Sequence, residues 1–213
     1  MNDAASAMDS IYRIQRHFYD VTRKPYLLGR DAMIEALAPP PGASLLEIGC
    51  GTGRNLIVAA SRYPDVSCFG VDVSGAMLET ARRSIERAGL GRRVTVARAD
   101  ATQFDPSRLF GRARFDRVFI SYALSMIPAW ETVLETGVVL AGEAGSLHVA
   151  DFGDQNGLPR WFRAALNAWL AKFSVTPRVD LRRLCEETAS RHGRRCEFRE
   201  LYRGYAAVAR VAA

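Results

Sequence analysis

What the sequence lacks already narrows the possibilities for this chain of 213 residues. Its four cysteines form no Cys-x-x-Cys pair, and its three histidines stand at no metal-ligand spacing from them. A metal site is therefore not expected, and free thiols in a reducing cytoplasm are the default. No apolar run approaches the ~18 residues of a membrane-spanning helix, and the acidic first ten residues lack the apolar stretch of a secretory signal. We expect a soluble, cytoplasmic protein.

Lysine is also scarce, since 27 of the 29 basic residues are arginine. The charge is uneven along the chain: residues 1–159 carry 17 basic and 18 acidic side chains (net −1), whereas residues 160–213 carry 12 and 5 (net +7). A basic patch of this kind favours an anionic partner, which can be nucleic acid, a membrane surface or an acidic substrate. The abundance of arginine can also reflect the composition of the source organism, so charge alone does not choose among these partners.

The apolar pattern predicts a single α/β domain over residues 1–213. With 48% apolar residues, the chain can bury a sizeable core. Apolar side chains recur at helical spacing through residues 10–37, where Pro25 and Gly29 interrupt the pattern. The proline-rich residues 39–42 end this segment. We therefore expect an N-terminal helical cap over residues 1–38 and a core over residues 44–213.

Within this core, short apolar runs alternate with longer helical stretches. The pattern predicts buried parallel strands joined by right-handed helical crossovers. The predicted strands are 44–48, 66–71, 94–97, 115–120 and 146–150, and the predicted helices are 54–63, 75–88, 129–140, 158–173 and 180–192. The last two runs, 196–202 and 205–211, are joined by Arg203-Gly204. Because this link is too short for a helix, we expect an antiparallel hairpin.

A glycine-rich loop stands where the first predicted strand meets the first helix. It reads Glu47-Ile48-Gly49-Cys50-Gly51-Thr52-Gly53, and glycine there lets the backbone turn sharply and approach a ligand closely. A P-loop is excluded because Arg54-Asn55 replaces the required Lys-Ser/Thr. The dinucleotide pattern GxGxxG is matched only in part, because Arg54 takes the place of its third glycine. The pattern ExGxGxG is instead typical of loops that bind S-adenosylmethionine (AdoMet).

Two aspartates follow the next two predicted strands. Asp72 ends the second strand, where a carboxylate can accept hydrogen bonds from both ribose hydroxyls of NAD or of AdoMet. Asp100 follows the third strand and can accept the amino group of an adenine, while Ala101 offers a backbone N–H to the ring. Asp100 can also act as the N-cap of the next turn. The two carboxylates support a nucleoside ligand without identifying it.

In this order and spacing, these residues resemble the class I AdoMet-dependent methyltransferases. The resemblance rests on Glu47, Gly49, Gly51, Gly53, Asp72 and Asp100, and it spans residues 44–151 and the terminal hairpin. It implies a Rossmann-like three-layer sandwich, with a seven-stranded, mostly parallel sheet that ends in an antiparallel hairpin. It also implies AdoMet as cofactor. The residues expected to hold it are Tyr19, Arg30, Glu47, Gly49, Cys50, Gly51, Gly53, Asp72, Val73, Asp100, Ala101 and Ser121.

The segment after the fourth predicted strand argues against some acceptors. Methyltransferases of nucleobase amino groups resemble one another in a (D/N/S)PP(Y/F/W) motif there, but Ser121 is followed by Tyr122-Ala123. We therefore expect no nucleic-acid partner despite the basic charge. The pair of glutamates of protein-arginine methyltransferases and the Asp/Asn ligands of metal-dependent catechol-type enzymes are not found either.

Residues 11–31, together with 121–130 and 151–154, resemble the bacterial betaine-lipid N-methyltransferases. Those enzymes trimethylate the amine of diacylglyceryl-homoserine. This resemblance covers nearly the whole chain and implies a lipid-headgroup substrate and peripheral contact with the anionic inner face of the membrane. Other acceptors stay open, namely phosphatidylethanolamine or a small soluble amine. A non-catalytic AdoMet-binding module and, more distantly, an NAD-dependent oxidoreductase also stay open.

Roles follow for several side chains. Tyr19 can contact the sulfonium of AdoMet and Arg30 can pair with its methionine carboxylate, although both can also be ordinary helix surface. The acceptor amine must be neutral to react, so a base or a proton path is needed. The candidates are Tyr122 as a hydrogen-bonding residue of the substrate site, Asp151 as a holder of the substrate ammonium, and His148, which can also be a packed histidine of the fifth strand.

The predicted helix over residues 158–173 carries an apolar stripe. Its members are Trp161, Phe162, Ala165, Leu166, Trp169, Leu170 and Phe173. The simplest expectation is that this stripe packs on the sheet. The alternative is that its tryptophans and flanking arginines contact a lipid surface, because a substrate with two acyl chains leaves a bilayer only at a high free-energy cost.

Overall fold

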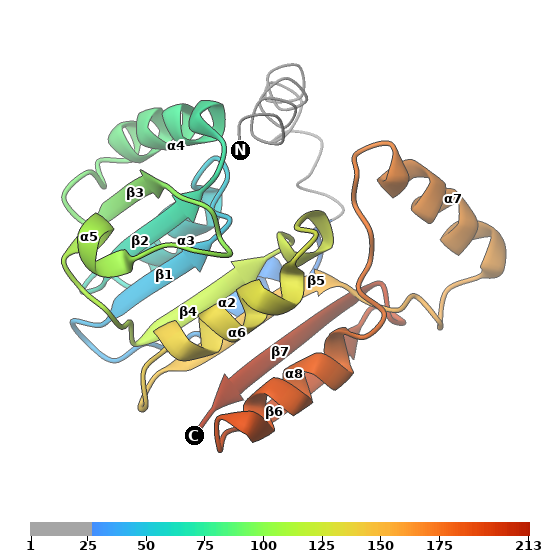
Figure 1. Cartoon of the computed structure of the whole chain (residues 1–213). Helices are drawn as coiled ribbons and strands as arrows, with labels where there is room; N and C mark the ends of the chain where they lie inside the picture. The colour runs from blue at the N-terminus through green and yellow to red at the C-terminus, as the bar shows by residue number, and fades with distance from the viewer. Residues whose placement is uncertain (1–26) are drawn as a thin grey trace.

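The structure, a computed structural model, describes residues 27–213 (Figure 1). Tyr19 and most of the predicted helical cap lie outside the described residues. The described part of the cap holds helix α2 (Arg30–Ala36), which begins directly after Gly29. Gly29 takes a left-handed conformation (φ 84°), which glycine adopts without steric cost. The predicted interruption at this residue is therefore confirmed as a helix start.

Seven strands form one sheet in the order β3-β2-β1-β4-β5-β7-β6. The strands are β1 (Ser44–Ile48), β2 (Ser67–Asp72), β3 (Val94–Arg98), β4 (Arg117–Ser121), β5 (Ser146–Phe152), β6 (Arg195–Leu201) and β7 (Ala206–Ala212). The first five are parallel, and β7 is antiparallel to both β5 and β6. The Rossmann-like sheet with its terminal hairpin is thus confirmed.

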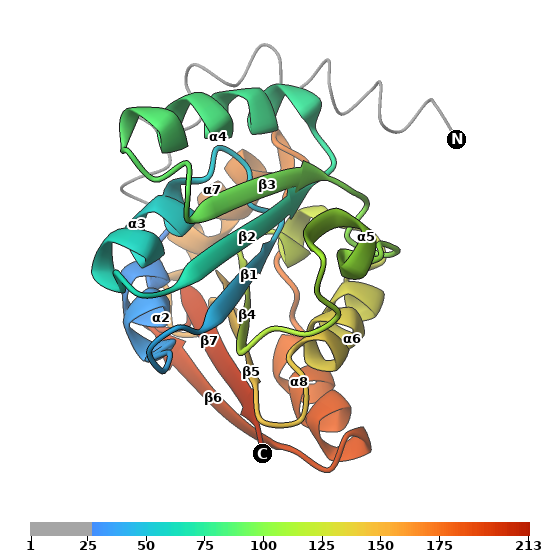
Figure 2. The ribbon, with the colours of Figure 1, turned by 90° about the vertical axis from the view of Figure 1, so that its left-hand side faces the viewer.

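Helices cover both faces of the sheet, so the fold has three layers (Figure 2). One face carries α2, α3 (Arg54–Arg62) and α4 (Gly75–Arg87), whose apolar side chains share a core with β1, β2 and β3. The other face carries α6 (Trp130–Leu140) and α8 (Leu181–Arg191), which share a second core with β4, β5 and β7. β1 and β5 are buried along their whole length, and this burial includes their polar residues Glu47, His148 and Asp151.

Local capping explains where some helices begin. The Ser74 side chain accepts a hydrogen bond from the backbone N–H of Met77 and caps α4, and Asp105 caps the short helix α5 (Pro106–Phe110) in the same way. The sequence pattern did not predict α5 or the 3-10 turn η1 (Leu124–Met126). Both are too short to show an apolar periodicity.

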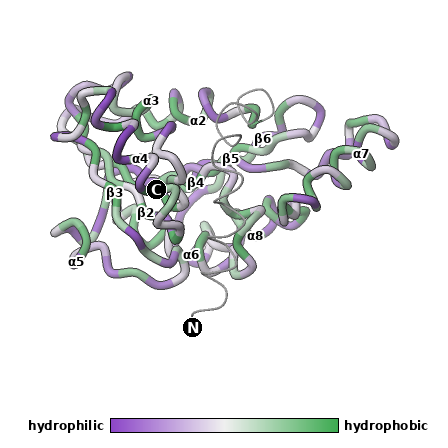
Figure 3. The backbone as a smooth tube through the Cα atoms, turned by 90° about the horizontal axis from the view of Figure 1, so that it is seen from above, coloured by the Kyte–Doolittle hydropathy of each residue, from purple (hydrophilic) through white to green (hydrophobic). Residues whose placement is uncertain are grey.

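Helix α7 (Arg160–Ala171) stands away from the sheet (Figures 1 and 3). Of its residues only Leu170 is buried, and Trp161 keeps 74% of its surface exposed. The expectation that its apolar stripe packs on the sheet is therefore wrong. The reason is that α2 already covers β5 and α8 covers β7. Only the C-terminal end of α7 packs, in a small cluster with Phe152 and Tyr205.

A membrane span is not found in the described part of the chain. No helix among residues 27–213 is both long and apolar enough to cross a bilayer.

Candidate active site

A cavity of about 850 Å³ opens at the carboxyl ends of the parallel strands. Its wall is formed by the loops that follow β1, β2, β3 and β4, together with the segment between α7 and α8. In an open parallel sheet, ligands bind at this edge, where the connections diverge to opposite faces. Here β1 lies between β2 and β4, so the cavity lies at the point where the strand order reverses.

The loop after β1 exposes bare backbone to this cavity. Gly49 has φ 77°, and a Cβ atom built on it would stand 2.6 Å from the Cβ of Ala123, in the loop after β4. Only glycine satisfies both conditions, because a side chain is strained at this φ and has no room. The backbone N–H groups of Gly49 and Cys50 donate to the carbonyl of Val71. These bonds hold the loop against the end of β2.

Asp72 fixes the loop from the other side. Its Oδ2 accepts from the backbone N–H of Gly51 at 2.8 Å, and its Oδ1 accepts from the backbone N–H of Ser74 at 2.9 Å. The carboxylate also lines the cavity, next to Val73. Since each carboxylate oxygen can accept more than one hydrogen bond, Asp72 can orient the loop and still accept from a ligand.

Asp100 and Ala101 line the same cavity after β3. The Oδ1 of Asp100 accepts from both the backbone N–H (2.9 Å) and the hydroxyl (2.7 Å) of Thr102. Asp100 therefore closes a local turn with one of its two oxygens. Asp100 can therefore cap this turn through Oδ1 and accept a hydrogen bond from a ligand through Oδ2.

Glu47 contributes a buried carboxyl group to the cavity wall. It is 1% exposed, and its Oε1 accepts from the side-chain amide of Asn55 at 2.7 Å. Its Oε2 is buried and finds no hydrogen-bond partner. Burial raises the pKa of Glu47 to about 8, and the nearby charge of Asp72 acts in the same direction. A buried carboxyl oxygen without a partner indicates a site that a cationic ligand group can complete.

Arg30 brings positive charge to the same end of the cavity. Its Nε donates to the carbonyl of Leu27 at 3.2 Å, and only 9% of the residue is exposed. Burial lowers the pKa of Arg30, and the neighbouring charge of Arg54 lowers it further. Arg54 itself forms an ion pair with Asp31 at 3.4 Å. Arg30 thus stands close to Glu47 on the cavity wall without an ion-pair partner of its own in the described chain.

Tyr122 and Ser121 end β4 at the cavity. Tyr122 has a left-handed backbone (φ 54°), and its hydroxyl donates to the carbonyl of Leu28 at 2.5 Å. Its ring meets that of Phe152 edge-on, with centroids 4.8 Å apart. Burial raises the pKa of Tyr122, so the phenol stays neutral near pH 7. Strain of this kind in a non-glycine residue is found preferentially at functional sites.

Two of the candidate catalytic residues do not reach the cavity wall. Asp151 is fully buried in β5, where it accepts from the backbone N–H of Ser125 (3.1 Å) and of Phe152 (2.8 Å). Burial raises its pKa to about 6. His148 is also buried and contacts the hydroxyl of Ser146 at 2.9 Å, and burial lowers its pKa to about 3. Asp151 supports the wall from behind, and His148 packs inside the sheet.

The cavity also has residues that sequence reasoning missed. Asn55 fixes Glu47, and its place in the first turn of α3, directly after the glycine loop, is a signal that could have identified it. Thr176 and Arg178 reach the wall from the connection between α7 and α8. Nothing in the local sequence marks these two residues, because only the chain's path over the end of the sheet brings them to the cavity.

Comparison with known proteins agrees with this geometry. Residues 45–138 match a family model described as a methyltransferase domain. A trans-aconitate 2-methyltransferase of Methylobacterium radiotolerans is 32% identical over 104 residues, which are 49% of this chain and 36% of that protein. A phosphatidylethanolamine N-methyltransferase of Cereibacter sphaeroides is 29% identical over 135 residues, 63% of this chain and 62% of that protein. The chain therefore spans only part of the length of these relatives.

Solved structures share the fold. One chain of the complex between the Haloferax volcanii Trm112 methyltransferase activator and its methyltransferase superposes with a TM-score of 0.76 at 12% identity, covering 96% of each chain. The phosphoethanolamine N-methyltransferase 2 of Haemonchus contortus, in complex with S-adenosyl-L-methionine, gives a TM-score of 0.63 at 24% identity, covering 81% of this chain and 38% of that one. At these identities the likeness concerns the fold.

Proposed function

We propose that this protein, whose residues 45–138 match a methyltransferase domain, is an AdoMet-dependent N-methyltransferase of a lipid headgroup. Its substrate is the primary amine of diacylglyceryl-homoserine, which it converts to the trimethylated betaine. Residues 1–213 form one domain in this proposal, with residues 1–38 as a cap over the site. The enzyme works at the inner face of the membrane without spanning it.

The cavity residues fit the cofactor. The backbone around Gly49 and Gly51 can approach the ligand closely, and the other residues line the same cavity. In this proposal Asp72 and Val73 hold the ribose, and Asp100 and Ala101 hold the adenine. At the other end, Glu47 has an unpartnered buried oxygen suited to an ammonium group, and Arg30 is suited to a carboxylate. When bound, AdoMet supplies an activated methyl group on its sulfonium.

The chain's own residues supply position and electrostatics. The acceptor must be held in line with the methyl group, which replaces a bimolecular encounter by a fixed geometry. The hydroxyl group of Tyr122 donates a hydrogen bond to the carbonyl of Leu28. Its oxygen can therefore still accept a hydrogen bond from a substrate amine. Asp151 fixes the backbone of Ser125, the next polar residue of the wall. Proton loss from the ammonium proceeds toward water through the open side of the cavity.

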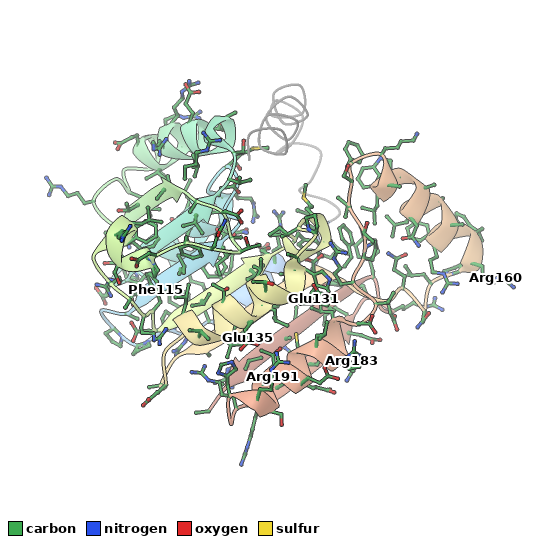
Figure 4. All side chains as sticks on the ribbon, in the orientation of Figure 1. Phe115, Glu131, Glu135, Arg160, Arg183 and Arg191 are labelled. Atoms are coloured by element: carbon green, nitrogen blue, oxygen red, sulfur yellow. The ribbon has the colours of Figure 1, made fainter. Side chains whose placement is uncertain are left out.

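The observation that carries the lipid assignment is the position of α7. A second apolar pocket, of only about 10 Å³, shares Tyr122 and Met126 with the cavity wall and is lined at the C-terminal end of α7 by Trp169, Leu170 and Phe173. The opposite end of the helix presents Trp161, exposed at 74%, and Arg160, which points away from the molecule (Figure 4). Amphipathic helices with aromatic and basic side chains bind at lipid interfaces. The relative from Cereibacter sphaeroides, whose name gives a lipid amine as substrate, supports the same class.

Lipid mass spectrometry after reaction tests this proposal. The chain is incubated with AdoMet carrying a labelled methyl group and with mixed micelles of diacylglyceryl-homoserine, of phosphatidylethanolamine, or with soluble primary amines. We expect mono-, di- and trimethylated betaine lipid in the first sample. Label in a soluble amine and none in lipid would reject the lipid assignment.

Phosphatidylethanolamine is the second candidate substrate, because the relative with that name covers 63% of this chain. Methylation of phosphatidylethanolamine in preference to diacylglyceryl-homoserine would select it. Binding of S-adenosylhomocysteine without transfer to any of these amines would instead indicate a non-catalytic AdoMet-binding module.

A further inference from the structure

Arg178 lies on the cavity wall at the end away from the adenosine-side carboxylates. It follows α7 in the chain and reaches the loop after β4, whereas Asp72 and Asp100 follow β2 and β3 on the other side of β1. Its Nε donates to the carbonyl of Leu124 at 2.9 Å, and its Nη2 donates to the carbonyl of Ile127 at 2.8 Å. The guanidinium therefore belongs to the part of the cavity that the cofactor residues leave for the acceptor.

The side chain is immobilised before any ligand arrives. The two carbonyls belong to the η1 turn and its end, and the guanidinium carbon lies 5.7 Å from the ring centroid of Trp130. A preorganised arginine loses little conformational entropy when it binds a ligand. Thr176, which donates its backbone N–H to the carbonyl of Ser125, holds the same connection against η1 and also lines the cavity.

The charge of Arg178 is not neutralised by an ion pair. Arg191, by contrast, pairs with Glu135 at 2.6 Å across α8 and α6 (Figure 4). No carboxylate of the described chain lies within ion-pair distance of Arg178, although its charge lowers the pKa of the Asp151 carboxyl group behind the wall. A guanidinium has five N–H donors, and the two carbonyls occupy two of them. The remaining donors suit a planar anionic group in a forked geometry.

We propose that Arg178 forms a subsite for an anionic group of the methyl acceptor, a carboxylate or a phosphate next to the amine. This inference rests on the proposed function and adds to it the residue that selects the substrate. A soluble amine without an adjacent anion offers no acceptor to the remaining donors of this guanidinium. The subsite thus favours zwitterionic headgroups over simple amines. By binding the anionic group, it also positions the adjacent amine.

The test compares an acid with its neutral ester. Diacylglyceryl-homoserine and its carboxyl methyl ester are offered to the wild-type chain and to the variants Arg178→Gln and Arg178→Lys. Wild type should lose about 10- to 100-fold in kcat/KM on the ester, as expected for one charge-assisted contact. Arg178→Gln should process acid and ester within about threefold of each other, and Arg178→Lys should keep part of the preference because it retains the charge but not the fork.

Controls separate recognition from structure. Arg195→Gln removes an exposed arginine of the edge strand β6 and should keep the wild-type ratio. The affinity for S-adenosylhomocysteine, measured by calorimetry, should stay within about threefold in Arg178→Gln. A variant that loses activity on acid and ester in equal proportion would overturn the inference, because Arg178 would then only support η1.

The source of the anion is decided in the same assay. Phosphatidylethanolamine and a long-chain amine without phosphate form a second pair, and a preference for the former that Arg178→Gln abolishes identifies a phosphate. No transfer by the wild-type chain to any amine would overturn the proposed function, and this inference with it. Transfer to both members of each pair at equal rates would overturn the inference alone.

Discussion

At the scale of single residues, the buried carboxyl group of Glu47 makes the cavity wall sensitive to pH, and in our proposal it links cofactor binding to pH. Its oxygens lie in the cavity wall, one held by Asn55 and the other without a partner. In the free protein the carboxyl group is protonated near neutral pH, because burial raises its pKa to about 8. A cationic group of a ligand next to it stabilises the ionised form. Ligand binding at this end of the cavity is therefore linked to proton release.

Glu47→Gln should change how stability depends on pH. The folded chain keeps the Glu47 proton up to about pH 8, whereas the unfolded chain releases it near the ordinary value of 4.5. The free energy of unfolding therefore falls as the pH rises between these values, by up to ~1.4 kcal/mol per pH unit. Between pH 7 and 8 Asp151, with a pKa of about 6, is mostly ionised in both states, and His148, with a pKa of about 3 in the folded chain and an ordinary value of 6.5 in the unfolded chain, is mostly neutral in both, so both contribute little. Urea unfolding in this range should show the slope in wild type and lose it in Glu47→Gln.

The matched control for this measurement is Glu131→Gln. Glu131 is an exposed glutamate at the start of α6 (Figure 4), so its variant should keep the wild-type slope. Equal slopes in wild type and in Glu47→Gln would mean that Glu47 is ionised in the folded chain at neutral pH.

At the scale of elements, the loop between β1 and α3 packs closely on its neighbours through glycines. Gly49 lies against Ala123 in the loop after β4. A Cβ atom built on Gly53, which has φ 76°, would lie 3.1 Å from the Cβ of Ala81 in α4. The two sides of the cavity are thus in van der Waals contact through glycines. A ligand held by the first loop is thereby positioned relative to the acceptor side.

Gly49→Ala tests the contact with Ala123. Its control is Gly89→Ala, because Gly89 has a similar positive φ but no such contact. The added methyl group would stand 2.6 Å from Ala123 in addition to the strain at φ 77°, and together these should cost about 2–4 kcal/mol in the free energy of unfolding. Gly89→Ala, at φ 69° with nothing within 4 Å, should cost only ~1 kcal/mol. Denaturant titration measures both. Calorimetry should show weakened S-adenosylhomocysteine binding only in Gly49→Ala, and equal effects of the two variants would exclude a role for the contact.

At the scale of the whole molecule, positive charge gathers in the part of the chain that follows β5. Residues 160–213 carry a net charge of +7, and they form α7, α8 and the β6–β7 hairpin, on one side of the molecule (Figure 1). Several of these arginines are paired, as Arg183 is with Glu187 at 2.9 Å. Arg160, the exposed arginine of α7, lies at the end that also presents Trp161. This side is the one that our proposal turns toward the membrane.

Vesicle co-sedimentation tests that orientation. Trp161→Ala combined with Phe162→Ala should reduce binding to anionic vesicles by about tenfold or more, since burial of each side chain contributes ~1.5–3 kcal/mol. Neutral vesicles should bind the wild-type chain more weakly, by about fivefold for each basic residue that approaches the surface. Val179→Ala removes a residue that is 72% exposed outside α7 and serves as the control. Equal binding to neutral and anionic vesicles would remove the electrostatic part of the proposal.

The sequence by itself predicted the seven strands and the longer helices in their order along the chain, because buried strands such as β4 carry a short apolar run. It also predicted that the glycine loop, Asp72 and Asp100 lie together at the carboxyl ends of the strands, and these residues line one cavity. Tertiary structure alone decided three things: that α7 stands off the sheet, that Asp151 and His148 lie behind the cavity wall, and that Arg178 reaches it. The physical reason is that local periodicity records whether a side chain is buried, but not which neighbour covers it. That choice depends on which faces of the sheet α2, α6 and α8 have already filled.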